Sequence, residues 1–197
     1  MPQEFPDTRA SLLVDIRDPS NVHAWSVFSE LYRPVIYRMA RRRGLQDADA
    51  QDLAQKVLVS VARAIGDWEE DANRGRFRHW LSRVTRNAII DVFRRMKPDA
   101  ALGGSAVTRV LNQSPAAQET EIDYEYERAM FRQAARLVQK EFQDATWKAF
   151  WQTTVDGKPV ALVASQLGQT PGAIYTARSR VMKRLKEAVD DLRDARS

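Results

Sequence analysis

Apolar side chains recur at intervals of three and four residues along much of this 197-residue chain, which is the spacing of a helix that buries one face. Three such stretches lie in the first half of the chain, at residues 25–39, 53–65 and 77–92. Gly44 and Gly66 fall between them, where helices are expected to end. The pattern therefore predicts a helical domain over residues 21–97.

The pattern stops at residue 98 and returns near residue 123. Residues 98–122 are rich in Gly, Ala, Ser and Pro, which is typical of a linker. A loop of this length inside one compact domain is unusual, so the sequence favours two domains. The second domain, residues 123–192, is predicted to contain helices near 131–142, 147–155, 160–167 and 172–189, with a turn at 156–159. The expected class is all-α: two small helical domains joined by a flexible linker, without strands.

The predicted linker ends in an acidic run. Every second position carries an acid, and the residues are Glu119, Glu121, Asp123, Glu125 and Glu127. We interpret this run as the solvated start of the helix that follows it. The sequence alone assigns it no binding role.

Residues 160–189 predict a helix-turn-helix. The short first helix ends at Gly168, where glycine permits the left-handed backbone that begins a tight turn. Thr170 is a suitable N-cap, and Pro171 suits the first position of the second helix. Residues 171–186 contain five Lys or Arg and no acid. Such a unit places its second helix in the major groove of DNA, although a solvated amphipathic helix with a basic face remains the alternative.

A second basic stretch, residues 74–97, carries eight Lys or Arg and one acid, Asp91. Phe77, Trp80 and Phe93 lie between these charges. Basic residues follow a phosphate backbone and aromatic faces stack unpaired bases, so the pattern favours binding to single-stranded nucleic acid. The side chains that we place on nucleic acid are Arg83, Arg86, Asn87 and Arg94. Phe77 and Leu81 are expected in the core, and Trp80 fits either role.

An acidic helix is predicted just before this stretch. Asp47 and Asp49 suit a helix N-terminus, where the helix dipole favours negative charge. Helical spacing also places Asp52, Lys56 and Ser60 on one side of the helix. That side is either a solvated surface or a docking surface for a protein partner.

Composition narrows the remaining possibilities. The chain is 44% hydrophobic and 29% charged, with a net charge of +5, which fits a folded protein with a polyanionic partner. It contains no cysteine, which excludes a disulfide scaffold, a thiol nucleophile and a Cys-ligated metal. Neither a secretory signal nor a bilayer span is evident, so we expect a soluble cytoplasmic protein without membrane insertion.

In this order, the segments resemble the extracytoplasmic-function (ECF) group of bacterial sigma-70 factors. AQDLAQKVLVSVARAI and GRFRHWLSRVTRNAIIDVFRR resemble the second conserved region of that family. LVASQLGQTPGAIYTARSRVMKRL resembles its fourth region. The resemblance implies a region 2-like domain at 21–97, a linker at 98–122 and a region 4-like helix-turn-helix domain at 123–192.

The resemblance also implies a function. It implies a sigma factor that binds core RNA polymerase and directs promoter recognition, promoter melting and transcription initiation. Catalysis then belongs to the polymerase, so we expect no enzyme activity, no cofactor and no metal site in this chain. The linker is expected to thread the RNA-exit path of the polymerase. Many members are held inactive by an anti-sigma factor, which is therefore a candidate partner.

Three sets of candidate residues follow from the resemblance. The clamp of the polymerase's largest subunit is expected to meet Asp49, Asp52, Leu53, Gln55 and Lys56. The −10 promoter element and its melted strand are expected to meet Arg76, Arg78, Trp80, Arg83, Arg86, Asn87, Arg94 and Arg95. The duplex −35 element is expected to meet Thr170, Gly172, Tyr175, Thr176, Arg178, Ser179, Arg180 and Arg184.

Two departures mark a divergent branch. Gln51 and Lys56 stand where the family often has acids, and FQDATWKAFWQTTVDG replaces a Leu-Pro-x-Arg-like opening of the fourth region. A stand-alone helix-turn-helix regulator is the main alternative, and it predicts promoter binding without polymerase. A helical nuclease that holds a metal through Asp47, Asp49, Asp52 or Asp91 is the other alternative, but these carboxylates lack a ligand-like set with a base.

Overall fold

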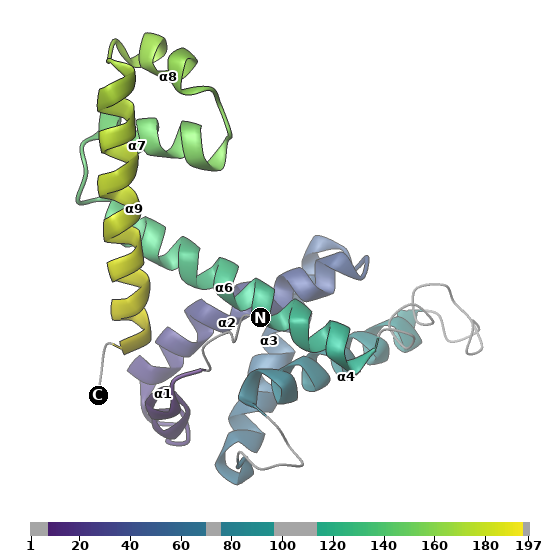
Figure 1. The fold of residues 1–197 in the computed structure, drawn as a ribbon. Helices are drawn as coiled ribbons and strands as arrows, with labels where there is room; N and C mark the ends of the chain where they lie inside the picture. The colour runs from purple at the N-terminus through teal and green to yellow at the C-terminus, as the bar shows by residue number, and fades with distance from the viewer. Residues whose placement is uncertain (1–7, 70–75, 97–113, 195–197) are drawn as a thin grey trace. The chain divides into compact units, whose positions relative to one another are not determined.

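The computed structural model describes residues 8–69, 76–96 and 114–194, and every regular element within them is helical. This confirms the all-α class. The chain divides into two compact units, of which unit 1 ends at Ala129 and unit 2 begins at Met130 (Figure 1). The elements are α1 (Ala10–Asp15), α2 (Val22–Arg42), α3 (Asp47–Ala64), the 3₁₀ turn η1 (Ile65–Asp67), α4 (Phe77–Met96), α6 (Pro115–Gln139), α7 (Asp144–Phe150), the π-helical turn η2 (Trp151–Val155), α8 (Val160–Leu167) and α9 (Pro171–Asp194).

Unit 1 packs α2, α3 and α4 around an aromatic core. Phe77 of α4 lies edge-on to Phe28 and Tyr32 of α2 and to Trp68, with ring centroids 5.4–5.8 Å apart. Leu81 is fully buried, so the prediction that Phe77 and Leu81 are core residues is confirmed. Burial raises the pKa of Tyr32 well above its usual value, and the neighbouring Tyr126 raises it further.

Gly44 ends α2 as the sequence predicts. Its φ of 93° lies in the left-handed region. The N–H of Gly44 donates to Arg41 O at 3.0 Å and the N–H of Leu45 donates to Ala40 O at 3.3 Å, which is the Schellman pattern of a helix C-terminus. The chain is thereby turned so that α3 can pack back on α2.

Helix α6 begins earlier than the sequence predicts. Residues 115–122 belong to this helix rather than to a flexible linker, and unit 1 extends to residue 129 rather than to 97. The reason is physical: Ile122, Tyr126 and Ala129 form an apolar seam that is buried on unit 1. Residues 98–113 of the predicted linker lie outside the described residues.

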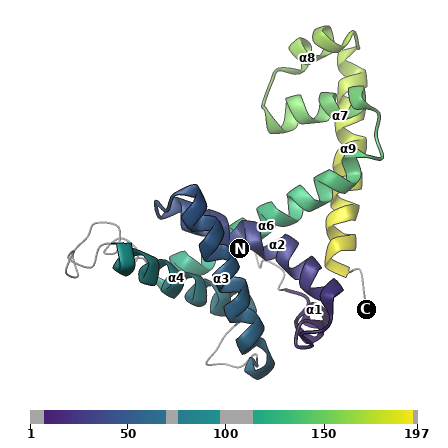
Figure 2. The ribbon, with the colours of Figure 1, turned by 180° about the vertical axis from the view of Figure 1, so that it is seen from behind.

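Unit 2 contains the last ten residues of α6 together with α7, η2, α8 and α9 (Figure 2). Its main core joins Val138 of α6, Trp147 and Phe150 of α7, and Val181 and Leu185 of α9. The helix predicted at 147–155 changes to π-helical geometry at Trp151. Thr153 lies in that turn and its hydroxyl donates back to Ala149 O at 2.7 Å, a bond that competes with regular helix geometry.

Among the described residues, none of the helices combines the length and apolarity that a bilayer crossing requires.

Candidate polymerase and nucleic-acid surfaces

The predicted polymerase-contact residues line a groove between α3 and α4. Its volume is about 210 Å³, and it is lined by Asp49, Asp52, Leu53, Lys56, Val92, Arg95 and Met96. Asp52 and Lys56 are exposed at its rim, as is the neighbouring Gln55, while Asp49 is half-buried. Leu53 is only 1% exposed, so it forms part of the floor rather than a projecting contact. The groove offers a protein partner an apolar floor with charges of both signs around it.

Asp47, the first residue of α3, makes hydrogen bonds to neighbouring side chains. Asp47 accepts a hydrogen bond from the Tyr37 hydroxyl at 2.5 Å and another from Gln51 Nε2 at 2.7 Å. Its carboxylate is therefore engaged at the N-terminus of α3, where the sequence predicts that the helix dipole favours a negative charge. No cluster of three or more His, Asp or Glu that could hold a metal occurs within residues 8–69, 76–96 and 114–194.

The outer face of α4 carries most of the predicted −10 residues. Arg83, Asn87, Arg94 and Arg95 are exposed, and Arg76, Trp80 and Arg86 are half-buried. Arg94 lies 4.0 Å from Asp91 on the same helix, so the one acid of this stretch has an arginine partner. This face of α4 is therefore basic and at least partly exposed to solvent.

Trp80 contacts the core and is also partly exposed. Its ring centroid lies 5.5 Å from that of Phe77 and 6.3 Å from that of Trp68, so one face packs on the core. The side chain is nevertheless only partly buried. An indole that is fixed on one side and open on the other is suited to stack on an unpaired base.

The prediction that Arg78 of α4 contacts the −10 element is not supported, because this side chain is fully buried. Its Nε lies 2.5 Å from Asp123 Oδ1, and its guanidinium lies over the Tyr126 ring at 4.5 Å from the centroid. Burial opposes the charge, but Tyr32 and Asp123 outweigh it and raise the pKa of Arg78. Arg78 therefore holds α6 against α4 and is not available to DNA. Sequence reasoning missed this because the partner lies 45 residues away.

Unit 2 presents α8, a short turn and α9 at the residues where the sequence predicts a helix-turn-helix. Gly168 has a φ of 61°, and the N–H of Gln169 donates to Ala164 O at 2.9 Å, which closes the end of α8. The N–H of Ala173 donates to Thr170 Oγ1 at 3.2 Å, so Thr170 caps α9. The turn thus fixes how α9 leaves α8.

The first turns of α9 are open to solvent. Thr170, Gly172, Tyr175, Thr176, Ser179 and Arg180 are exposed, and Arg178 is half-buried. The Arg178 guanidinium lies 5.9 Å from the centre of the Tyr175 ring, and Tyr175 itself is 58% exposed. The Thr176 hydroxyl donates to Gly172 O at 3.0 Å. These side chains can reach base edges in a major groove.

Arg184, the last predicted −35 residue, is engaged within unit 2. Its Nε and Nη2 donate to both oxygens of Glu141 at 2.7 and 2.9 Å, and Nη1 lies 3.4 Å from Asp191. A two-point arginine–carboxylate pair fixes the planar guanidinium. Arg184 therefore joins α9 to the segment between α6 and α7 and is a weak candidate for a phosphate contact.

The contrast between Arg180 and Arg184 gives a direct test. Arg180→Ala removes an exposed cation, and we expect it to weaken duplex DNA binding by about 1–3 kcal/mol. Arg184→Ala removes an engaged cation on the same helix and is expected to change DNA affinity by less than about twofold. Fluorescence anisotropy with labelled DNA from upstream of the gene measures both. Equal losses in the two variants would contradict the assignment of the reading face.

Comparison with known proteins adds an independent finding. Residues 28–98 match the family described as sigma-70 region 2. This span contains α3 and α4 and most of α2. A curated relative, the ECF RNA polymerase sigma factor SigE of Mycolicibacterium smegmatis, is 30% identical over 78 residues. The matched stretch covers 40% of this chain and 29% of that relative.

Proposed function

We propose that this chain, which belongs to the sigma-70 family through its residues 28–98, binds core RNA polymerase and directs it to promoters. The observation that carries the proposal is the position of the basic face of α4. It lies inside the stretch that matches region 2, and its arginines, Asn87 and Trp80 are accessible there. A DNA regulator that used only α8 and α9 would need no such second surface.

Unit 1 supplies two surfaces in this proposal. The groove between α3 and α4, with Asp52, Gln55 and Lys56 at or beside its rim, docks on the clamp of the polymerase's largest subunit. The outer face of α4 binds the −10 element. Flipping a base out of the duplex costs a few kcal/mol, and in this proposal Trp80 and Asn87 receive the flipped base of the non-template strand. The arginines beside them bind the phosphates and favour the melted state.

Unit 2 supplies the duplex contact. The start of α9 enters the major groove of the −35 element, where Tyr175, Arg178 and Arg180 read base edges or phosphates. In this role the chain acts in the cytoplasm beside the polymerase and performs no catalysis of its own. An anti-sigma factor is a proposed further partner.

The test is reconstitution with core polymerase. We expect the purified chain to co-migrate with core polymerase in gel filtration and to direct run-off transcription from DNA upstream of its gene. A chain that binds this DNA alone and ignores the polymerase would instead be a stand-alone regulator.

A charge reversal tests the docking groove. Asp52→Arg places a cation in the groove, and we expect it to weaken polymerase binding by about tenfold because a charge is reversed at a complementary surface. Asp156→Arg makes the same charge change on an exposed turn of unit 2 and is the matched control. Binding titrations with labelled polymerase measure both. Unchanged affinity of Asp52→Arg would move the docking surface elsewhere.

A further inference from the structure

Residues 115–129, the first part of α6, form an acidic arm that lies across α2 and α4 of unit 1 (Figures 1 and 2). Its apolar seam is centred on Ile122 and Tyr126, which are 0% and 4% exposed. Acids at every second residue of a helix fall on both sides of such a seam, since each residue turns the helix by about 100°. One row faces α4 through Asp123, and the other row, Glu121 and Glu125, faces α2.

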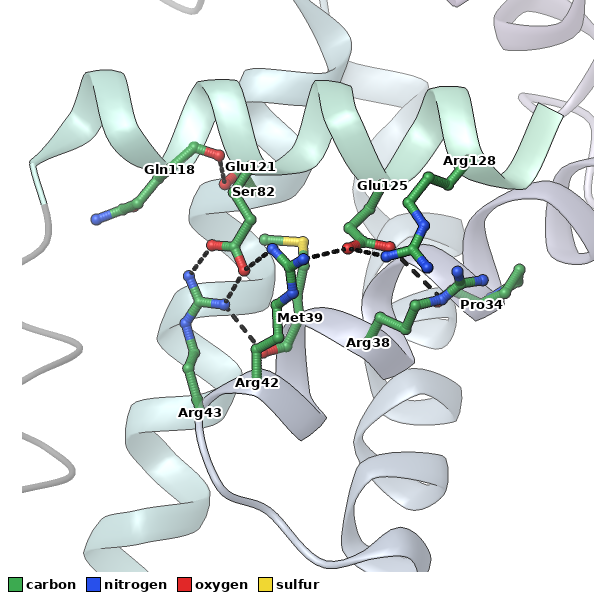
Figure 3. Close-up of polar contacts among 10 residues, drawn as sticks. All are labelled: Pro34, Arg38, Met39, Arg42, Arg43, Ser82, Gln118, Glu121, Glu125 and Arg128. Atoms are coloured by element: carbon green, nitrogen blue, oxygen red, sulfur yellow. Dashed lines mark hydrogen bonds and ion pairs between the residues drawn. The ribbon is translucent and has the colours of Figure 1, made fainter. Parts of the chain in front are cut away.

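The α2 row meets three arginines at the end of α2 (Figure 3). Arg43 donates to both oxygens of Glu121 at 2.9 and 2.6 Å, and also to Met39 O at 2.9 Å. Arg42 and Arg38 lie 3.2 and 3.5 Å from the Glu125 carboxylate. The two-point pairing of Arg43 with a carboxylate is the same geometry that arginine uses for a phosphate.

Within this row, Glu125 is poorly held, in contrast to Glu121 with its two-point pair to Arg43. Glu125 is 0% exposed, yet neither of its carboxylate oxygens accepts a hydrogen bond, and Arg38 Nη1 is buried without one. Burial lowers the pKa of Arg38 despite the attraction of Glu125, so the protein environment opposes its charge. Taking a carboxylate out of water costs several kcal/mol, which ion pairs without hydrogen bonds offset only in part. Glu125 therefore contributes little to the attachment of the arm, which depends on the apolar seam, the Arg78–Asp123 pair and the Arg43–Glu121 pair.

Positive charges outnumber negative charges where this row meets α2. Arg38, Arg42, Arg43 and the arm's own Arg128 surround two carboxylates, which leaves a net positive charge. Arg42 and Arg128 keep 49% and 46% of their side-chain surface exposed. Residues 31–46 contain five arginines and no acid, so the end of α2 attracts polyanions even with the arm in place.

We propose that Arg38, Arg42 and Arg43 form a second nucleic-acid-binding face of unit 1, which Glu121 and Glu125 occupy in the free chain and which DNA phosphates occupy when they displace the acidic arm. This face is separate from the outer face of α4. The inference rests on the proposed function for its ligand class, since a DNA-binding chain meets phosphates at high local concentration. Its test needs neither polymerase nor promoter, so the two proposals can fail separately.

The first experiment uses the full chain with Glu121→Gln and Glu125→Gln together. The matched control, Glu119→Gln with Glu127→Gln, removes the same charge from the side of the helix that carries Asp123. With a labelled duplex of about 20 base pairs and no promoter sequence, we expect the first variant to bind about tenfold more tightly at low salt. Its slope of log K against log salt should steepen by about two, since each phosphate contact contributes about 0.9.

Two results decide this experiment. Adding Arg42→Ala to the Glu121→Gln, Glu125→Gln variant should remove most of the gain in affinity. Arg42 is the most exposed of the three arginines at the end of α2 that pair with the arm. Equal gains in the variant and in the matched control would reflect net charge alone and would overturn the proposal. Thermal melting of each variant establishes that it is folded.

The second experiment follows the unmodified chain by hydrogen exchange. Adding the same duplex should reduce protection of the amides of residues 116–129, while the amides of α3 keep theirs. Unchanged protection of the arm at saturating DNA would overturn the proposal. So would release of the arm by polyglutamate but not by DNA, since the face would then accept an acidic protein segment. A chain that fails to direct transcription and still releases its arm on DNA would overturn only the proposed function.

Discussion

Asp123→Ala is expected to destabilise unit 1 by about 3–5 kcal/mol, the usual cost of breaking a buried ion pair. Arg78 is fully buried, and its Nε lies 2.5 Å from Asp123 Oδ1. Without Asp123, the guanidinium of Arg78 would lose its closest carboxylate in a region that water does not reach. Because the pair joins α4 to the acidic arm, we expect the arm to detach and the aromatic core of unit 1 to loosen with it.

Urea unfolding, monitored for unit 1 by hydrogen exchange of the α2, α3 and α4 amides, measures this effect. Glu119→Ala is the control, because that acid is 39% exposed, lies 3.5 Å from His79 and sits on the same helix. We expect it to change stability by less than about 0.5 kcal/mol. Arg78→Met combined with Asp123→Leu should recover most of the loss, since an apolar pair replaces a buried charge pair at little cost. If Asp123→Ala and Glu119→Ala lowered stability equally, the special role of the pair would be refuted.

Phe150→Ala is expected to cost unit 2 about 3–5 kcal/mol, the usual range for truncating a buried aromatic side chain. Phe150 is fully buried in the core formed by α6, α7 and α9, and its ring centroid lies 5.6 Å from that of Trp147. A void at this point removes the support of α9, so duplex binding should be lost together with the fold of unit 2.

Leu137→Ala is the matched control for Phe150→Ala. Leu137 also belongs to unit 2, but it is 48% exposed, so its truncation is expected to change stability by less than about 1 kcal/mol. Chemical denaturation followed by tryptophan fluorescence gives the stability, and hydrogen exchange assigns the loss to residues 130–194. Duplex binding at full strength by Phe150→Ala would show that the reading face of α9 does not depend on this core.

Helices whose buried faces are formed by nearby sequence were predictable. The apolar spacing in α2, α3 and α4 has the helical period, α2 ends near Gly44 as predicted, and Gly168 has the predicted positive φ. The turn and cap between α8 and α9 were equally readable, because Gly168 and Thr170 act on neighbouring backbone groups. Local chemistry was sufficient in each of these cases.

Two of the predicted DNA-contact residues have partners that the sequence does not reveal. Arg78 has the composition of a DNA contact, but Asp123, far along the chain, pairs with it in the core. Arg184 likewise pairs with Glu141, which belongs to the segment between α6 and α7. A face that is basic in sequence is not necessarily a free face, because the pairing of charges depends on tertiary contacts.

The acidic run was the largest omission, although a signal for it was present. Ile122 and Tyr126 are four residues apart and lie between acids, which is the pattern of a helix that buries a narrow stripe. The Gly-, Ser- and Pro-rich composition just before it obscured this pattern. Sequence reasoning therefore treated Asp123 and Glu125 as solvated, whereas they are 7% and 0% exposed.

The docked arm changes what counts as the smallest self-sufficient piece of the protein. Met96 and Ser114 both belong to unit 1, so the arm that follows Ser114 is part of the same body as α4. A recombinant fragment that ended at residue 97 would lack Asp123, the carboxylate that pairs with Arg78. It would also expose to solvent the apolar surface of unit 1 that Ile122 covers. Such a fragment should self-associate in solution, whereas one continued through residue 129 should stay monodisperse.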